Sequence, residues 1–341
     1  MELSAAFAIP GDLACLTGGY AYDREVLTRI AGLRHLPLPQ GFPFPSPDVL
    51  VQSATCLSAV EPDEVLLCDG LAFGALPEQI LKQISARIVA LVHHPLALET
   101  GLSAEGAQDL ALRERKALGF ARRVIVTSPI TRDLLVRDYA VDAACITVAL
   151  PGTQRASRAQ GSGAKSLHLL AVGSVVPRKG YDVLLDALEV CDDLDWQLTI
   201  AGSLERAPDY VQPLLARASD RIHFAGEVTS DALDALYDRT DLFIMSSHYE
   251  GYGMVLGEAM VRGLPIVTTD GGALVETVPE HAALRVKAGD AAALAQALRR
   301  AITDRNLRHT LADASFAEGA RLPTWDETAH IIARVLKEVA P

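Results

Sequence analysis

Disulfide chemistry and long apolar runs are both missing from this 341-residue chain. Its five cysteines are dispersed and include no Cys-x-x-Cys pair, which argues against a disulfide framework and is typical of reduced core thiols in a cytosolic protein. No run of about 18 apolar residues occurs, so no membrane-spanning helix is predicted. The opening MELSAAFAIPGD lacks a basic n-region, and Pro10-Gly11 comes too early for a signal peptide. We therefore expect a cytoplasmic protein.

Basic residues are outnumbered, since 31 Lys and Arg stand against 43 Asp and Glu, a formal net charge of −12. Proteins that bind nucleic acid need a basic surface to neutralise phosphates, so we expect no nucleic-acid partner. A local basic patch would still allow membrane contact. Residues 112–123 are the nearest candidate, with five basic side chains, but the solvated face of a helix explains them equally well.

Short apolar runs alternate with amphipathic stretches along the whole chain. The runs are rich in Val, Ile and Leu without period-two alternation, as expected for strands that are buried on both faces. They cover residues 3–9, 64–69, 87–94, 123–128, 145–150, 167–174, 196–203, 221–228, 242–247 and 264–270. Helical patterns such as 180–190 and 230–240 lie between them. This alternation predicts an α/β fold with doubly wound parallel sheets.

The composition changes at residues 153–166, which are small and polar and are predicted to form a linker. A domain has about 150 residues on average, so this linker predicts two α/β domains. In such sheets, ligands bind outside the carboxyl ends of the strands. Two domains that face each other would therefore form a binding cleft.

The segment YEGYGMVLGE (249–258) places two carboxylates, Glu250 and Glu258, around a glycine-rich stretch. Residues 242–247 are a predicted strand, and 255–263 have a helical pattern, so the glycines lie in a strand-to-helix loop. Free N–H groups at the start of a helix bind phosphate, and glycine lets a ligand approach the backbone. Taken alone, the two glutamates are also compatible with ordinary solvated positions.

Residues 167–280 resemble the donor half of family 4 of the retaining glycosyltransferases, which have the two-domain GT-B fold. The resemblance lies in the two glutamates separated by seven residues within EGYGMVLGEAMVRGLPIVTTDGGALVE, and in AVGSVVPRKGYDVLLDAL, LTIAGS and HFAGEV. It implies two Rossmann-like domains that face a cleft. The acceptor domain would be 1–152, the donor domain 153–321, and the last helix, within 322–341, would pack back on the first domain.

The resemblance implies a hexosyltransferase-type enzyme that moves a sugar from a nucleoside diphosphate sugar to a hydroxyl, with retention at the anomeric carbon. We expect a saccharide or small-molecule acceptor and no cofactor besides this donor substrate. No Asp-x-Asp motif stands where a metal-dependent transferase would use it, so no obligatory metal is expected. Front-face attack, with the leaving phosphate as base, is favoured over double displacement.

Several alternatives stay open at this point. One is a non-catalytic sugar-nucleotide-binding subunit, and another is a glycosyltransferase with a lipid acceptor. A two-domain epimerase or phosphorylase would lack the paired glutamates. A dinucleotide oxidoreductase is disfavoured, because no G-x-G-x-x-G follows the first predicted strand.

The resemblance also assigns roles to residues of the donor half. Glu258 would hold the ribose hydroxyls, and Glu250 would face the transferred sugar and its leaving phosphate. The backbone amides of Gly253, Met254 and Val255 would contact the sugar or diphosphate. Further implied donor contacts are Gly18, Gly19, Gly173, Ser174, Gly226, Val228, Gly251 and Tyr252.

Arg178 and Lys179 follow the strand 167–174 and would stabilise the charge of the leaving diphosphate. In the family an arginine follows the glycine at this strand end, whereas here Ser174 follows Gly173. Lys179 matches the family lysine. The sequence leaves open whether Arg178 replaces the missing arginine or whether both bases are ordinary surface residues.

The family also has a histidine that touches the transferred sugar, and HHPLALETG (93–101) supplies two candidates. We favour His94, with His93 as the alternative, although a purely structural histidine is equally compatible. Adjacent side chains diverge on extended backbone, and no ligand cluster has zinc spacing, so no metal site is predicted. Candidate acceptor contacts are Tyr20, Tyr22, Asp69, His93 and Ser128, and Asp23 and Arg24 would also face the cleft.

Overall fold

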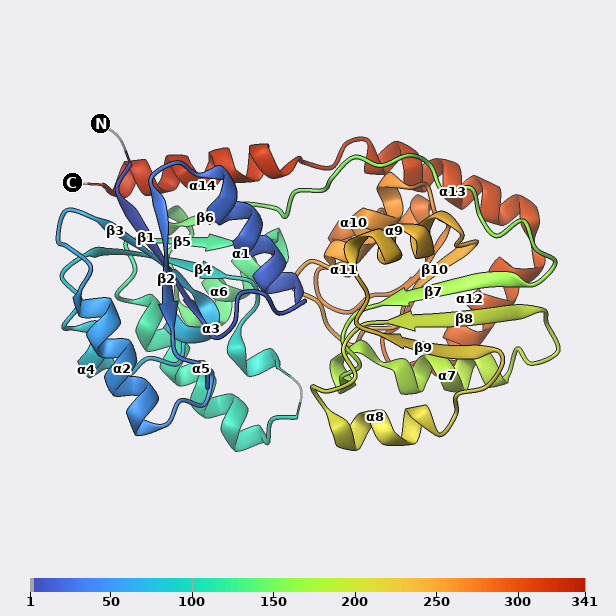
Figure 1. The fold of residues 1–341 in the computed structure, drawn as a ribbon, viewed down its shortest axis with the longest axis horizontal. Helices are drawn as coiled ribbons and strands as arrows, with labels where there is room; N and C mark the ends of the chain where they lie inside the picture. The colour runs from blue at the N-terminus through green and yellow to red at the C-terminus, as the bar shows by residue number, and fades with distance from the viewer. Residues whose placement is uncertain (1–2, 100, 341) are drawn as a thin grey trace. The chain divides into compact units, whose positions relative to one another are not determined.

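The computed structural model describes residues 3–99 and 101–340. Contacts between Cα atoms divide the chain into two compact units, unit 1 (Met1–Gly152 with Pro323–Pro341) and unit 2 (Thr153–Leu322). Each unit has a six-stranded sheet in which every pairing of strands is parallel, with helices packed on both faces (Figure 1). The predicted fold class, two doubly wound α/β domains, is confirmed.

The sheet of unit 1 has the strand order β2-β1-β3-β4-β5-β6. Its strands are β1 (Ala5–Pro10), β2 (Leu33–Leu38), β3 (Val65–Asp69), β4 (Arg87–Val92), β5 (Arg123–Val126) and β6 (Ile146–Val148). Its helices are α1 (Gly18–Arg29), α2 (Pro47–Ser58), α3 (Gly70–Phe73), α4 (Glu78–Leu81), α5 (Ala104–Leu118), α6 (Pro129–Tyr139) and α14 (Trp325–Val339).

Both faces of this sheet are buried. Ala6 and Ala8 of β1 share one hydrophobic core with side chains of α2, α3, α5 and α6. Phe7, between them, is fully buried and points to the opposite face, because successive strand residues alternate. There α14 contacts β3, β4 and β5, and α1 lies beside α14. Burial on both sides explains why these strands read as continuous apolar runs.

The sheet of unit 2 has the strand order β12-β11-β10-β7-β8-β9. Its strands are β7 (Leu167–Val172), β8 (Trp196–Ala201), β9 (Ile222–Gly226), β10 (Leu242–Met245), β11 (Ile266–Thr269) and β12 (Ala283–Val286). Its helices are α7 (Tyr181–Glu189), α8 (Pro208–Leu215), α9 (Ser230–Asp238), α10 (Met254–Val261), α11 (Leu274–Thr277), α12 (Ala291–Thr303) and α13 (Arg305–Gly319).

Unit 2 is also a three-layer structure. Leu169 and Ala171 of β7 share a core with α7, α8 and α12, whereas Leu170 shares the opposite core with α9 and α10. The central strands therefore bring their carboxyl ends, and the loops that follow them, to one edge of a sheet that is covered on both faces. This edge holds most of the predicted donor residues.

Two strands, β2 and β12, were not predicted from the sequence. Each lies at an edge of its sheet and is only partly buried, with exposed Arg34 and His35 in β2 and half-buried Arg285 in β12. An edge strand pairs on one side only and tolerates polar residues and proline. The apolar-run criterion therefore misses these two strands, because polar side chains interrupt their apolar runs.

Residues 153–166 have no regular secondary structure, as predicted, but they are not a free linker. Ala159 N–H donates to the Arg262 carbonyl (2.9 Å) and Gly161 N–H to the Asp238 carbonyl (2.8 Å). The Ser162 hydroxyl donates to Asp241 (2.5 Å). The segment is thus fastened to unit 2 along its length. Its polar composition reflects hydrogen bonding to that surface.

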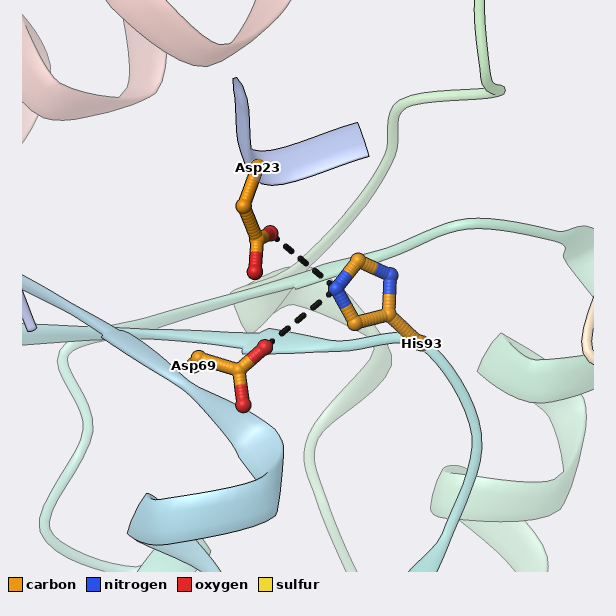
Figure 2. Close-up of side chains that lie close together, drawn as sticks. All are labelled: Asp23, Asp69 and His93. Carbon is orange, nitrogen blue, oxygen red and sulfur yellow. Dashed lines mark hydrogen bonds and ion pairs between the residues drawn. The ribbon is translucent and has the colours of Figure 1, made fainter. Parts of the chain in front are cut away.

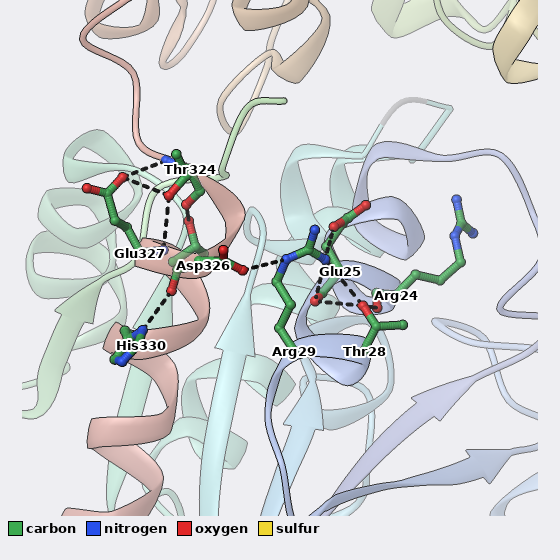
Figure 3. A network of polar contacts seen from close by, with 9 residues as sticks. Arg24, Glu25, Thr28, Arg29, Thr324, Asp326, Glu327 and His330 are labelled. Atoms are coloured by element: carbon green, nitrogen blue, oxygen red, sulfur yellow. Dashed lines mark hydrogen bonds and ion pairs between the residues drawn. The ribbon is translucent and has the colours of Figure 1, made fainter. Parts of the chain in front are cut away.

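Helix α14 is fixed to α1 within unit 1 by polar contacts (Figure 3). Arg29 of α1 donates to Asp326 at 3.1 Å. Thr324 caps the helix start in a reciprocal capping box with Glu327. The buried face of α14 then packs against the sheet.

The cysteines carry no disulfide in the structure, and all five are free. Cys68 and Cys191 are buried, but Cys15, Cys56 and Cys145 are only partly buried, so the expectation of core thiols holds for two of the five. Within residues 3–99 and 101–340, no helix combines the length and apolarity needed to cross a membrane.

Gly319 is the closest approach of α13 to α10, and its substitution should destabilise unit 2. A Cβ at this position would lie 2.5 Å from the carbonyl carbon and oxygen of Met260. Gly319→Ala forces backbone apart, and we expect a loss of about 1–3 kcal/mol in the free energy of unfolding. Urea unfolding followed by tryptophan fluorescence measures it.

Gly106→Ala in α5 is the matched control. Its added Cβ would meet only the Ser103 hydroxyl, at 3.3 Å, and alanine is the better helix former by about 1 kcal/mol. This variant should be at least as stable as the wild type. Equal stability of the two variants would contradict the close α10–α13 contact.

Candidate functional site

The loop between β10 and α10 carries the two glutamates that the sequence singled out. Gly253 precedes α10 in the left-handed conformation (φ 89°), and a Cβ there would lie 2.7 Å from Leu274. Glycine is therefore required for α10 to begin at Met254. The first N–H groups of a helix lack intrahelical acceptors, so the amides of Met254 and Val255 stand at an opening suited to an anion.

Glu250 is 7% exposed and forms ion pairs with two basic side chains. Its carboxylate lies 2.8 Å from Lys179 Nζ and 3.0 Å from Arg178 Nη1. Burial alone would raise the pKa of Glu250, but the charges of Lys179 and Arg178 outweigh it and lower this pKa to about 2. The carboxylate is thus ionised at neutral pH, and the group of three carries one net positive charge.

The two cations are positioned by the loop that follows β7. Residues Pro177–Lys179 form a short 3-10 helix that ends at Gly180, in the left-handed conformation (φ 62°). The Arg178 carbonyl accepts from His248 N–H at 2.8 Å, and the Lys179 carbonyl accepts from the Ser246 hydroxyl at 2.9 Å. Arg178 Nη1 also donates to the Tyr249 carbonyl at 2.8 Å. The loops after β7 and β10 therefore hold each other in place.

Glu258 lies one turn inside α10 and is held differently. The Tyr237 hydroxyl of α9 donates to Glu258 Oε2 at 2.8 Å. Burial raises the pKa of Glu258, and the Tyr237 hydrogen bond and the charge of Arg262 oppose this rise. No pattern in the sequence indicates this role of Tyr237, because an aromatic residue in an amphipathic helix is usually a core residue.

Ser174 stands where the family has an arginine, directly after Gly173. Gly173 has φ 147°, and a Cβ there would lie 3.0 Å from Lys179 Cε. The Tyr181 hydroxyl donates to the Gly173 carbonyl at 2.9 Å. The lysine stem therefore packs directly against the strand end, while Arg178 lies beside it on the same carboxylate. Ser174 itself is half-buried.

The remaining residues of the predicted donor set lie on the loops of unit 2 or, for two glycines, in unit 1. Gly226 ends β9 with φ 66°, and Val228 is half-buried two residues later. Gly251 is half-buried, and Tyr252 is 7% exposed, with its carbonyl accepting from the Thr277 hydroxyl. The structure thus brings most of the set to the carboxyl edge of the unit 2 sheet.

Gly18 and Gly19, the two implied donor glycines of unit 1, lie in a helix. They are the first residues of α1, which Thr17 caps by accepting from Tyr20 N–H at 3.3 Å. A Cβ on Gly19 would lie 3.4 Å from His93 Cδ2. The absence of a side chain at Gly19 therefore lets His93 lie close to the helix.

His93, Asp23 and Asp69 form a second charged group, in unit 1 (Figure 2). His93 Nε2 lies 3.1 Å from Asp23 Oδ1 and 3.3 Å from Asp69 Oδ2. Asp23 is fully buried and Asp69 is 3% exposed. Burial lowers the pKa of His93. The charge of Asp23 and the hydrogen bonds with both carboxylates raise it by more than burial lowers it, so the pKa of His93 is raised overall. The imidazole is charged at neutral pH.

These three residues could also hold a metal ion, since their ligand atoms lie within 4.8 Å of one another. The sequence could not indicate this grouping, because the residues come from α1, the end of β3 and the loop after β4. The charged imidazole already supplies a cation between the two carboxylates. The contacts are therefore accounted for without a metal.

The structure separates the two histidines. His94 Nε2 lies 2.5 Å from Glu99 Oε1, whereas His93 joins the buried carboxylates and also accepts, through its carbonyl, from the Thr127 hydroxyl at 3.0 Å. The divergence of the two side chains matches the expectation for extended backbone. The neighbours of His93 were not foreseen.

The other acceptor candidates have internal partners. The Tyr20 hydroxyl donates to the Pro10 carbonyl at 2.6 Å. Tyr22 is fully buried, and its hydroxyl donates to the Ala149 carbonyl at 3.0 Å. Ser128 is 1% exposed and caps α6 by accepting from Thr131 N–H at 3.1 Å. Tyr22 and Ser128 thus lie in the interior of unit 1. Their sequence positions at strand ends did not reveal that one is a core residue and the other a helix cap.

Arg24, also expected to face the cleft, donates to the carbonyls of Leu13 (2.5 Å) and Cys15 (3.0 Å). Gly271 and Gly272 are needed for close packing, since a Cβ on either would lie 2.4 Å from a backbone oxygen, of His248 or of Glu250. These residues shape the loops and have partners within the fold.

Residues 153–317 match the family model described as "Glycosyl transferases group 1". The chain is 30% identical over 281 residues to the D-inositol 3-phosphate glycosyltransferase of Streptomyces bingchenggensis (strain BCW-1), covering 73% of this chain and 62% of that protein. Across the first four curated relatives, the matched part spans 39% to 62% of the relative's length.

Two solved structures have the same fold over nearly the whole chain. The sucrose-phosphate synthase from Thermosynechococcus elongatus has a TM-score of 0.82 at 20% identity and covers 98% of each chain. Anabaena HepE in complex with UDP and glucose has a TM-score of 0.77 at 17% identity, with 98% of this chain and 99% of that chain covered. At these identities the likeness establishes the fold alone, GT-B.

Replacing Glu250 by a neutral residue should destabilise the fold, because its carboxylate forms two buried ion pairs. Glu250→Gln leaves Arg178 and Lys179 without their carboxylate, and we expect a loss of about 3–5 kcal/mol in the free energy of unfolding. The folded-state pKa is below the ordinary value of 4.5, so the carboxylate stabilises the fold above pH 4.5 and loses this contribution as the pH falls toward 2. Urea unfolding at pH 7, 4.5 and 3.5 should show a shrinking difference from the wild type.

Glu189→Gln is the control for this prediction. Glu189 pairs with Arg217 at 2.6 Å, but its side chain is 69% exposed, and an exposed pair contributes about 0–1 kcal/mol. A difference for Glu250→Gln as small as the one for Glu189→Gln would contradict the buried ion-pair assignment.

The charged state of His93 is open to direct measurement by ¹⁵N NMR of the imidazole nitrogens. His93 should remain doubly protonated at pH 8, because two carboxylates flank it. His35, whose pKa burial lowers, provides a neutral ring in the same spectrum. Asp23→Asn should bring the titration of His93 to lower pH. A neutral His93 at pH 7 in the wild type would contradict the geometry described above.

Proposed function

We propose that this chain, whose residues 153–317 match the glycosyl transferases group 1, transfers a sugar from a nucleoside diphosphate sugar to a hydroxyl group, with retention at the anomeric carbon. The acceptor we propose is a saccharide or a small hydroxylated molecule. This chain matches only part of the length of the first curated relatives. The identities of the donor and of the acceptor are therefore part of this proposal.

The observation that carries this proposal is the charge arrangement around Glu250. Two cations, Lys179 and Arg178, hold one buried carboxylate in the loop that leads to the start of α10. The net positive charge and the amides at that start favour a dianionic diphosphate. The same groups would stabilise the charge that develops on the leaving phosphate as the glycosidic bond breaks.

Glu258 is proposed to bind the ribose of the donor. A carboxylate accepts hydrogen bonds from hydroxyl groups, and Glu258 lies on the same helix whose start would hold the diphosphate. Arg178 is proposed to bind the diphosphate together with Lys179. It would supply the second cation for the leaving group that Ser174 cannot supply.

For the reaction itself we propose front-face attack, in which the acceptor hydroxyl approaches from the side on which the diphosphate leaves. The hydroxyl proton passes to the leaving phosphate, and the new glycosidic bond keeps the anomeric configuration. Lys179 and Arg178 supply the positive charge that this step needs, so no obligatory metal is part of the proposal.

The first experiment is donor turnover. The protein is incubated with UDP-, GDP- and ADP-sugars, with and without EDTA, and the released nucleoside diphosphate is measured. We expect slow hydrolysis of one donor, unaffected by EDTA. Lys179→Ala should lower kcat/KM about 100-fold or more, because a preorganised cation is removed from the leaving group. Glu258→Ala should mainly raise KM.

Lys165→Ala is the control, since Lys165 lies in the same unit with a side chain that is 93% exposed. It should behave as the wild type. Binding of a sugar nucleotide without turnover, even with acceptors present, would favour a non-catalytic subunit. Failure to bind any sugar nucleotide would overturn the proposed function. If EDTA abolished turnover, the metal-independent part would be wrong, and Asp23, Asp69 and His93 would be the first ligands to test.

A further inference from the structure

Tyr237 is a buried phenol whose hydroxyl serves one carboxylate of the proposed donor site. The side chain is 1% exposed, and its hydroxyl donates to Glu258 Oε2 at 2.8 Å. A buried hydroxyl without a partner is costly, so this hydrogen bond ties the interior of α9 to α10. The mechanism proposed above does not use Tyr237.

Two ring contacts restrict the rotation of the Tyr237 side chain and so fix the position of its hydroxyl. It stacks on Phe243 with ring centroids 5.8 Å apart and an interplanar angle of 25°. On the ring face, the Arg262 guanidinium lies 4.6 Å from the centroid. Such contacts restrict an aromatic side chain with only two rotatable bonds. Glu258 is therefore held by a rigid donor.

Arg262 is close to Glu258 but does not pair with its carboxylate. Its Nη1 donates to the Glu258 carbonyl at 3.0 Å, and its Nη2 pairs with Asp234 of α9. Among the described residues, the structure shows no ion pair between the Glu258 carboxylate and a basic side chain. Glu250, by contrast, pairs with two.

This difference defines the ligand that each carboxylate suits. The charge of Glu250 is compensated, so an anion can bind beside it. The hydrogen-bond donor of the Glu258 carboxylate is a neutral phenol, so no ion pair among the described residues compensates this carboxylate when it is ionised. An uncompensated carboxylate repels phosphate and accepts hydrogen bonds from neutral hydroxyls, and two adjacent hydroxyls can engage it together.

We propose that Tyr237 is a positioning residue for recognition of a vicinal diol by Glu258, the diol being the ribose 2′- and 3′-hydroxyls of the donor. This inference rests on the proposed function. Tyr237 contacts no substrate itself. It fixes the carboxylate by a hydrogen bond that opposes the rise in its pKa caused by burial, and it adds no positive charge that would attract the diphosphate to this part of the helix.

The groups that face the Glu258 carboxylate support this assignment. Tyr237 and Asp234 come from α9, and Arg262 directly follows α10. Burial and Asp234 raise the pKa of Glu258, whereas Tyr237 and Arg262 lower it. Removing the phenol hydroxyl takes away one of the two contacts that lower the pKa of Glu258. The carboxylate should then become protonated, and diol binding should weaken, at a higher pH than in the wild type.

The test compares Tyr237→Phe with Tyr210→Phe by calorimetry. Tyr210 is a matched control, because its hydroxyl also donates to a carboxylate of unit 2, Asp182 Oδ1 at 2.6 Å, on helices α8 and α7. The probes are the nucleoside diphosphate that wild type binds, chosen among UDP, GDP and ADP, and its 2′,3′-dideoxy analogue. Both variants keep their aromatic ring.

Tyr237→Phe should weaken binding of the nucleoside diphosphate about tenfold, the effect of one hydrogen bond to a charged group, and change binding of the dideoxy analogue less than twofold. Its loss of affinity with falling pH should begin at a higher pH. Tyr210→Phe should match the wild type with both probes. Equal weakening of both probes by Tyr237→Phe, or no weakening of either, would overturn the positioning role.

Two further outcomes separate this inference from the proposed function. Wild type that binds the nucleoside diphosphate and its dideoxy analogue equally well would overturn the diol assignment and leave the transferase proposal standing. Wild type that binds no nucleotide would overturn both. Should Tyr237→Phe fail to fold, 3,5-difluorotyrosine at position 237, a stronger donor of the same shape, should increase the discrimination between the two probes, and an unchanged ratio would contradict the proposal.

Discussion

The buried charge of Glu250 is the constraint from which the arrangement of unit 2 follows. Moving a carboxylate out of water costs several kcal/mol unless cations and hydrogen bonds replace the solvent. Glu250 lies in the loop after β10, and Lys179 and Arg178, which provide the cations, belong to the loop after β7.

 That loop keeps its shape through the left-handed Gly180 and through hydrogen bonds to residues 246–249. One buried anion therefore fastens two loops at the carboxyl edge of the sheet.

The same constraint explains the glycines around the site. The segment that carries Glu250 pairs with Gly272 in an isolated parallel bridge, and a Cβ at Gly272 would lie 2.4 Å from the Glu250 carbonyl oxygen. Gly253 then turns the chain into α10. Each glycine stands where another backbone or side chain approaches too closely for a Cβ. The glycine-rich sequence is thus a consequence of packing three loops around one ion-paired carboxylate.

The sequence predicts the parts of the structure that depend on local patterns. Central strands are buried on both faces and appear as Val-, Ile- and Leu-rich runs, and the start of α10 follows from Gly253 and the helical pattern after it. Strands β2 and β12 escape this criterion because Arg34 and His35 in one, and Arg285 in the other, interrupt the apolar run. The grouping of Asp23 and Asp69 around His93, and the bond from Tyr237 to Glu258, join residues far apart in the chain. No spacing rule indicates such pairs, and a single sequence gives no other signal for them.

Each unit places one charged group of three at the carboxyl end of its parallel strands, and the two groups have opposite composition. In unit 2 two cations surround one carboxylate, which leaves one positive charge. In unit 1 two carboxylates flank one charged imidazole, which leaves one negative charge when both carboxylates are ionised. A net positive group favours a phosphate, whereas a net negative group disfavours it and accepts hydrogen bonds from neutral hydroxyls. Because burial strengthens electrostatic interactions, the opposite net charges would give the two groups different preferences for charged and neutral ligands.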